Sequence, residues 1–239
     1  MTDKLTSKSS SVVKTTREGV DAFLQAVKET PPAAVQEGRG RLIFALDATA
    51  SRQRTWDRAM ALQNDMFINT RGIGELDVQL VYYRGYDECR ASKWLQNADQ
   101  VVGMMRKVSC MAGTTQIHRV LKHAIAEAKA RPVQALVFIG DCIEEDVDQL
   151  GNLAGQCRLL NMPVFLFQEG RDPRARSAFK QIATLSGGAH CQFDESSARA
   201  LGDLLNAVAA YAAGGRKALL ALKDKGSRQA VTLLEQIDG

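Results

Sequence analysis

Three oxygen-bearing side chains, Asp47, Thr49 and Ser51, alternate directly after the apolar stretch 41–46. That stretch is nearly free of charge and is too short for a reliable helix, so it predicts a buried strand that ends at Asp47. An extended turn would direct the three side chains to one point, and converging oxygens are the ligands of hard cations. The stretch therefore predicts part of a Mg²⁺ or Mn²⁺ site, and the alternative for Ser51 is the N-cap of the following helix.

Two later segments supply further oxygen donors at equivalent places. The apolar stretch 133–139 predicts another strand, and Asp141 follows its end. Thr114 and Thr115 lie in a small loop directly before a helical pattern that begins at Ile117, where a helix cap is the alternative role. The candidate metal ligands are two carboxylates and three hydroxyls: Asp47, Thr49, Ser51, Thr115 and Asp141. Mg²⁺ takes about six oxygens and retains waters, so this incomplete cage leaves a position for the carboxylate of a partner.

Catalytic readings of the same residues are weaker. A phosphatase of the haloacid dehalogenase type needs a second acid where Thr49 stands. The opening strand is followed by no Walker loop, no G-x-S-x-G and no G-x-G-x-x-G. Glu144 and Glu145 are the candidate general bases, but their position at the start of a predicted helix over 146–160 favours a role with the helix dipole. We therefore expect no enzymatic activity.

The elements that position these residues alternate between strands and helices. This rhythm predicts a Rossmann-like, doubly wound, mostly parallel sheet with helices on both faces, in one domain. A further edge segment over 88–94 is expected to form a hairpin across Gly85. The predicted strands cover 41–46, 76–83, 133–139, 163–167 and 189–193, and the predicted helices cover 56–67, 99–109, 117–125, 146–160, 174–185 and 196–213.

Composition excludes several other classes of protein. The 239 residues carry a net charge of +4, but the basic residues are scattered among acids, which argues against nucleic-acid binding. No apolar run approaches the roughly 18 residues of a membrane span, and no cleavable leader is apparent, so we expect a cytoplasmic protein without a membrane contact. The five cysteines include no C-x-x-C pair, which argues against a disulfide framework or a structural zinc site.

Four motifs in this order resemble the von Willebrand factor type A (VWA) domain with its metal-ion-dependent adhesion site, which has an integrin I-like fold. They are D-x-T-x-S from Asp47, G-T-T before the middle helix, G-D after the strand over 133–139, and IATLSGGAHCQF over 182–193. The resemblance covers about 41–213, and leaves 1–40 as an N-terminal tail, helix and connector and 214–239 as a C-terminal helical extension. Thr49 replaces the usual Ser, Thr115 matches the family's threonine better than Thr114, and Cys142 replaces the usual Gly of the third loop.

The resemblance implies a protein-interaction module of the intracellular bacterial type. Mg²⁺ or Mn²⁺ on the five named residues would capture an Asp or Glu of a partner, and AAA+ ATPases of the MoxR or chelatase type are the implied partner class. A VWA fold that binds partners without metal is the main alternative. A metal-dependent phosphoesterase is a further one.

Overall fold

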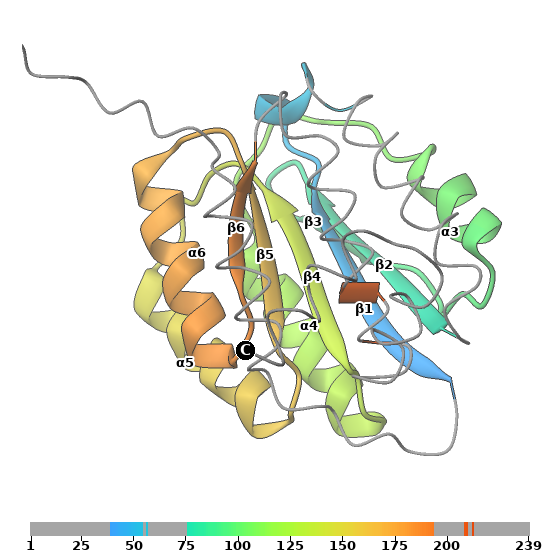
Figure 1. The fold of residues 1–239 in the computed structure, drawn as a ribbon. Helices are drawn as coiled ribbons and strands as arrows, with labels where there is room; N and C mark the ends of the chain where they lie inside the picture. Colours follow the sequence, from blue (N-terminus) through green and yellow to red (C-terminus); the bar gives the residue numbers. More distant parts are fainter. Residues whose placement is uncertain (1–38, 55, 57–75, 194–207, 210–211, 213–239) are drawn as a thin grey trace, which may run out of the picture.

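A single mixed sheet organises the computed structural model, which describes residues 39–54, 56, 76–193, 208, 209 and 212. Its strand order is β3-β2-β1-β4-β5-β6, and every neighbouring pair is parallel except β2 with β3 (Figure 1). The predicted Rossmann-like fold with a mostly parallel sheet is therefore confirmed. The strands are β1 (Gly40–Asp47), β2 (Leu76–Arg84), β3 (Glu88–Ala91), β4 (Ala135–Gly140), β5 (Val164–Glu169) and β6 (His190–Phe193). The helices are the 3-10 helix η1 (Ala50–Arg52), α3 (Ala98–Met105), α4 (Ile117–Ala130), α5 (Val147–Leu159) and α6 (Pro173–Ser186).

The strand order reverses beside β1, at the centre of the sheet. The chain adds β2 and β3 on one side of β1 and then crosses to its other side to form β4, β5 and β6. Such a reversal opens a crevice at the carboxyl ends of the two strands that flank it, here β1 and β4, and this is where open α/β sheets bind their ligands. The fold thus brings the two predicted acid-terminated strands next to each other.

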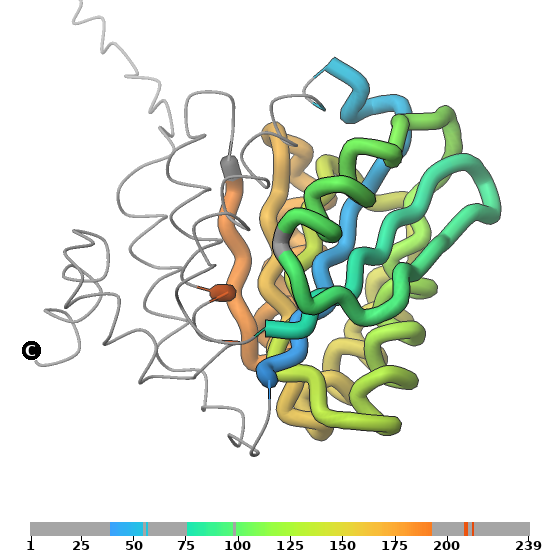
Figure 2. The backbone as a smooth tube through the Cα atoms, turned by 90° about the vertical axis from the view of Figure 1, so that its right-hand side faces the viewer, coloured from blue at the N-terminus to red at the C-terminus, as the bar shows by residue number. Residues whose placement is uncertain are grey.

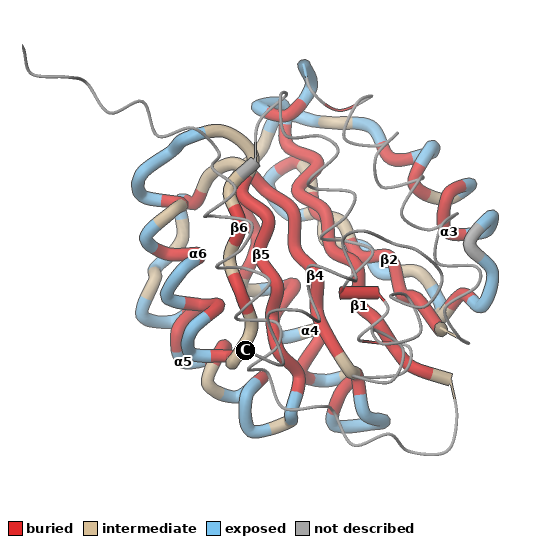
Figure 3. The backbone as a smooth tube through the Cα atoms, viewed as in Figure 1, coloured by how far each residue is buried: buried red, intermediate tan, exposed pale blue. Residues whose placement is uncertain are grey.

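Helices cover both faces of the sheet, which explains why its central strands are almost entirely apolar. All eight residues of β1 are buried (Figure 3). Leu42, Phe44 and Leu46 pack in one core cluster with residues of α3 and with Val208, whereas Ile43 packs with α4, α5 and α6 in the other. Figure 2 shows α4 and α5 together on one side of the sheet, and Val208 and Ala212 belong to the core cluster of the other side.

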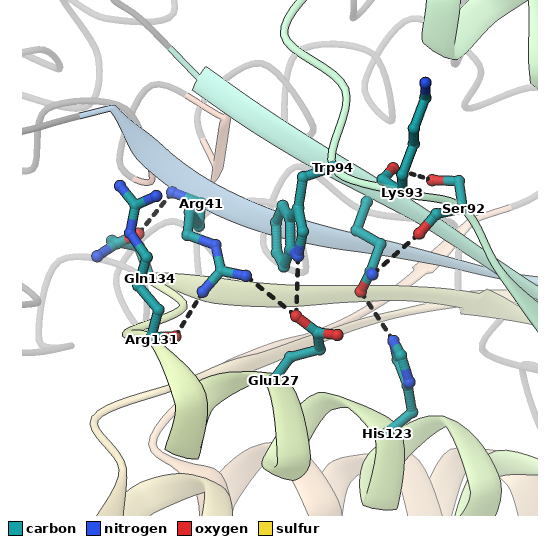
Figure 4. A network of polar contacts seen from close by, with 9 residues as sticks. Arg41, Ser92, Lys93, Trp94, His123, Glu127, Arg131 and Gln134 are labelled. Carbon is teal, nitrogen blue, oxygen red and sulfur yellow. Dashed lines mark hydrogen bonds and ion pairs between the residues drawn. The ribbon is translucent and has the colours of Figure 1, made fainter.

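A polar network joins β1 to α4 at the amino end of the strand (Figure 4). The Arg41 guanidinium lies 3.7 Å from the centre of the Trp94 ring, donates to the carbonyl of Arg131 at 2.6 Å and pairs with Glu127 at 3.0 Å. The Trp94 indole N–H donates to the same Glu127 carboxylate at 2.8 Å. This buried cation is therefore both stacked and paired, so it holds the carboxyl end of α4 against the sheet.

Several predicted boundaries change in the structure. The edge segment forms β3 antiparallel to β2 after a turn at Gly85, whose φ of +60° suits glycine, but the strand ends at Ala91 and excludes Trp94. Helix α3, which was predicted over 99–109, ends earlier, at Met105. The helices predicted over 56–67 and 196–213 lie outside the described residues except for 56, 208, 209 and 212. The predicted terminal segments 1–40 and 214–239 also lie outside them, apart from 39 and 40.

Membrane spans and disulfides can be examined among the described residues. Among the described residues, no helix combines the length and apolar character that a membrane span requires. The five cysteines are all described and all carry free thiols, and Cys157 and Cys191 are buried.

Gly188, in the loop between α6 and β6, permits a close backbone approach that a side chain would prevent. A Cβ atom on Gly188 would lie 2.1 Å from the carbonyl oxygen of Val164. We expect Gly188→Ala to lower the free energy of unfolding by about 1–3 kcal/mol or more, because backbone atoms of β5 would have to move.

The matched control is Gly155→Ala within α5, where a Cβ atom would meet nothing within 4 Å. We expect this variant to be more stable than the wild type by about 0.5–1 kcal/mol, since alanine favours the helix. Urea denaturation followed by circular dichroism measures both. Equal destabilisation of the two variants would contradict the argument.

Candidate functional site

A fully buried carboxylate, Asp47, lies at the carboxyl end of β1, the central strand. Its Oδ1 accepts hydrogen bonds from the Thr49 amide at 2.8 Å and the Thr49 hydroxyl at 2.6 Å, and its Oδ2 accepts one from the Tyr83 hydroxyl at 2.9 Å. Burial raises the pKa of Asp47 above its ordinary value, while the bonds from Thr49 lower it. Three donors thus partly replace the water that the carboxylate has lost.

The hydroxyls of Thr49 and Ser51 form a chain that leads to Asp47. The two oxygens are 3.1 Å apart, and because the Thr49 proton points to Asp47, the Ser51 hydroxyl is the donor between them. Both oxygens therefore keep lone pairs for a cation. The three side chains are thus hydrogen-bonded in sequence, with Thr49 extended and Ser51 already in η1, and their convergence on one cation stays a prediction. Ser51 lies inside η1, whose N-cap is Thr49, and the helix predicted over 56–67, for which Ser51 was the alternative N-cap, lies outside the described residues except for 56.

The second acid of the site, Asp141, follows the end of β4. The parallel pairing of Leu46 with Ile139 brings the ends of β1 and β4 together, and potential ligand atoms of Asp47, Asp141 and Cys142 lie within 4.8 Å of one another. Asp141 Oδ1 is buried and has no hydrogen-bond partner, which is rare for a native carboxylate. Burial, with the charges of Asp141 and Asp47, raises the pKa of the Cys142 thiol to about 12. Asp141, whose buried oxygen has no hydrogen bond, is therefore available as a metal ligand.

The predicted ligands lie in three loops: the first follows β1 (47–51), the second precedes α4 (112–116) and the third follows β4 (141–145). The second loop binds to the third through a reciprocal pair of hydrogen bonds. The Thr115 hydroxyl accepts from the Glu144 amide at 3.0 Å, and the Thr115 amide donates to the Glu144 carboxylate at 3.0 Å. Thr115 is buried, whereas Thr114 is half-buried and its amide donates to the carbonyl of Gly85. The choice of Thr115 over Thr114 as a ligand stays a prediction. Both threonines lie in the second loop, which is hydrogen-bonded to the third loop.

The acids of the third loop serve a helix other than the one that the sequence suggested. Glu145 accepts from the amides of Ile117 at 2.7 Å and His118 at 2.8 Å, at the amino end of α4. The predicted role of Glu144 and Glu145 in the first turn of the helix over 146–160 is therefore wrong, because both precede α5, whose N-cap is Asp146. Their carboxylates instead satisfy amides at the start of α4 and complement its dipole.

Tyr83 is a site residue that the sequence did not single out. It lies opposite Asp47 in the parallel register of β1 and β2, is fully buried, and stacks on Phe138 with ring centres 6.2 Å apart. Burial and the neighbouring charge of Asp47 raise the pKa of its phenol well above its ordinary value, so it acts as a neutral donor. The signal in the sequence was the shared end point of two predicted parallel strands.

Arg52 is the second such residue, and it sets the charge balance of the first loop. Its side chain has no exposed surface, donates to the Asp47 carbonyl at 2.7 Å and pairs with Glu169 at 2.9 Å. Its charge lowers the pKa of Asp47. Nothing in the local pattern marked it, because its anionic partner lies 117 residues away in the sequence.

The oxygen atoms of the predicted ligands suit a divalent cation. Asp141 offers an oxygen without a hydrogen bond, Asp47 Oδ2 keeps one lone pair beside its bond from Tyr83, and the Ser51 hydroxyl belongs to an exposed residue. Carboxylate and hydroxyl oxygens are the ligands of Mg²⁺ and Mn²⁺. A bound cation would stabilise the two neighbouring carboxylates, which otherwise repel each other.

No protein-family model matches this sequence, and a comparison with curated proteins finds no match. Solved structures are similar in fold. A von Willebrand factor type A protein from Catenulispora acidiphila matches with a TM-score of 0.61 and 15% identity over 73% of this chain and 43% of that one. The VWA domain of SpRpn10 matches with a TM-score of 0.56 and 12% identity over 71% and 95%. An aerotolerance-related membrane protein from Bacteroides fragilis matches with a TM-score of 0.52 and 15% identity over 70% and 98%.

The sheet and these similarities define the fold of the chain as that of VWA domains. At such low identities, the similarity concerns the fold alone.

The hydrogen bond from Tyr83 to Asp47 is testable through stability. We expect Tyr83→Phe to lower the free energy of unfolding by about 1–3 kcal/mol, because a buried carboxylate oxygen loses its donor. Tyr82→Phe is the control, since Tyr82 is the adjacent, partly exposed residue. Urea denaturation at pH 7 in EDTA measures both variants. Similar losses in the two would show that the bond contributes nothing specific.

The buried charge of Asp47 should destabilise the metal-free protein. Because the pKa of Asp47 is raised in the folded state, the folded protein binds this proton more tightly than the unfolded chain does. The contribution of Asp47 to the free energy of unfolding therefore falls as the pH rises from the pKa in the unfolded chain, about 3.9, through the higher pKa in the folded protein.

We expect Asp47→Asn, measured in EDTA, to lack this fall and to be at least as stable as the wild type at pH 7. Asparagine can keep the bonds from Thr49 and, through its amide group, the contact with Tyr83. Urea denaturation at several values between pH 4 and pH 8 tests this. A variant much less stable than the wild type across the whole range would contradict it.

Proposed function

We propose that this chain is a protein-interaction module that binds a carboxylate of a partner through Mg²⁺ or Mn²⁺. Asp47, Thr49, Ser51, Thr115 and Asp141 are the proposed ligands. The observation that carries the proposal is the buried oxygen of Asp141, which has no hydrogen bond. It lies beside the buried carboxylate of Asp47, where the strand order of the sheet reverses. A cation would resolve both the missing bond and the repulsion. When bound, the ion supplies an electrophilic position that an Asp or Glu can fill.

The surface beside the first loop supports a protein as the partner. Met111 donates its amide to the carbonyl of Ala48, and its side chain is 44% exposed. A Cβ atom on Gly85 would lie 2.8 Å from the Met111 side chain, and the next residue, Tyr86, is 77% exposed. Exposed methionine and tyrosine are typical of interaction surfaces. We therefore expect the partner to present an apolar contact next to its carboxylate.

A binding role is favoured over a catalytic one. The two candidate bases of the third loop, Glu144 and Glu145, already accept amide hydrogen bonds from Thr115, Ile117 and His118. A carboxylate that is held in this way at the start of a helix is a poor general base. A metal-dependent phosphoesterase therefore ranks below a binding module.

The main alternative is a scaffold with the VWA fold that binds its partner without metal. The engagement of the Thr115 hydroxyl by the Glu144 amide favours this alternative, because the second loop is ordered without a cation. That hydroxyl oxygen still keeps lone-pair capacity for a metal. AAA+ ATPases of the MoxR or chelatase type are the partner class that we propose for either mode.

Metal titration separates the two modes. We expect Mg²⁺ and Mn²⁺ to bind the wild type in isothermal titration, and Asp141→Asn to weaken binding by about tenfold or more, or about 1.4 kcal/mol. Asp148→Asn is the control, because Asp148 is an exposed acid in the first turn of α5. Acetate added to the Mn²⁺-loaded protein should displace a bound water and lower the water-proton relaxation enhancement. No heat with either metal up to millimolar concentration would favour the metal-free scaffold.

A further inference from the structure

Cys142 adds a sulfur atom to a site whose other ligands are oxygens. In the described part of the chain, Asp47, Asp141 and Cys142 are the one group of at least three acidic, histidine or cysteine residues with potential ligand atoms within 4.8 Å of one another. Cys157 and Cys191 lie in the core clusters and do not belong to this group. The position of Cys142 directly after Asp141 therefore places a thiol where the two acids meet.

The carboxylate groups in this cluster have capacity for another ligand. Asp141 Oδ1 is inaccessible to solvent and has no hydrogen bond. Asp47 Oδ2 accepts one bond, from Tyr83, and has a second lone pair. Two oxygens and one sulfur can therefore bind one ion without breaking any hydrogen bond of Asp47.

The distances suit a small ion with mixed ligands. Zinc lies about 2.3 Å from sulfur and about 2.0–2.2 Å from carboxylate oxygen, so neighbouring ligands in a tetrahedral site are about 3.5 Å apart. The cluster spans at most 4.8 Å, so rotation of side chains can close it around an ion. Sulfur favours Zn²⁺ and Co²⁺, whereas Mg²⁺ binds oxygen ligands almost exclusively.

We propose that Cys142 is a metal ligand that makes this site bind a thiophilic divalent ion, of the Zn²⁺ class, more tightly than Mg²⁺. The inference rests on the proposed function, since it concerns the same cation site. On binding, the sulfur–metal bond forms as the thiol releases its proton to solvent, and no electrons are transferred. Mg²⁺ and Mn²⁺ use the oxygens alone.

Cobalt reports directly on the sulfur ligand, because Co²⁺ takes the place of Zn²⁺ and a bound thiolate gives a near-ultraviolet charge-transfer band. We expect this band in the wild type and its loss in Cys142→Ser, with Zn²⁺ affinity reduced about tenfold or more in competition with a chromophoric chelator. Mn²⁺ affinity should be unchanged in the same variant. Circular dichroism and thermal unfolding in EDTA establish that the variant is folded.

Cys110→Ser is the matched control, because Cys110 is also half-buried and senses the charges of Asp47 and Asp141. We expect it to keep the cobalt band. Loss of the band in Cys110→Ser but not in Cys142→Ser would overturn the assignment. Binding of Mn²⁺ without a cobalt–thiolate band in the wild type would overturn this inference alone, whereas failure of every metal to bind would overturn the proposed function as well.

Discussion

The negative charge of Asp47, at the buried end of the central strand, is the constraint on which the candidate site depends. A carboxylate without exposed surface must find protein donors, and the donors of Asp47 come from two places. Thr49 provides them from the next turn and Tyr83 from the neighbouring strand. Arg52 holds the Asp47 carbonyl and adds a positive charge. The hydrogen bonds that the buried Asp47 carboxylate requires thus position the end of β2 and the first loop.

The second and third loops are fixed to each other rather than to Asp47. Glu144 and Glu145 bind amides at the start of α4, and Thr115 returns a hydrogen bond to the third loop. The hairpin at Gly85 adds a third contact, since a Cβ atom on Gly113 would lie 1.9 Å from its carbonyl oxygen. These contacts hold the threonine and Asp141 in place before any ligand arrives. Such preorganisation lowers the free-energy cost of binding.

The charged groups at the amino ends of the central strands have different surroundings from those at the carboxyl ends. At the amino edge of β1, the Arg41 guanidinium is stacked on Trp94 and paired with Glu127. At the carboxyl edge, Asp141 keeps an oxygen without a hydrogen bond beside another acid. Paired charges contribute to the structure, whereas a buried carboxylate oxygen without a hydrogen bond is available as a ligand. The contrast places the available ligand oxygen at the carboxyl ends of the central strands.

The sequence by itself determined the fold class, because uninterrupted apolar runs between amphipathic segments predict buried parallel strands. It also placed Asp47 and Asp141 at strand ends, since each follows its own run directly. Only the tertiary structure decided that Tyr83 donates to Asp47, that Glu145 binds α4, and that Cys142 joins the two acids. Strand register and contacts between loops set these pairings. Such contacts join residues far apart in the chain, so they leave no periodic pattern in the sequence.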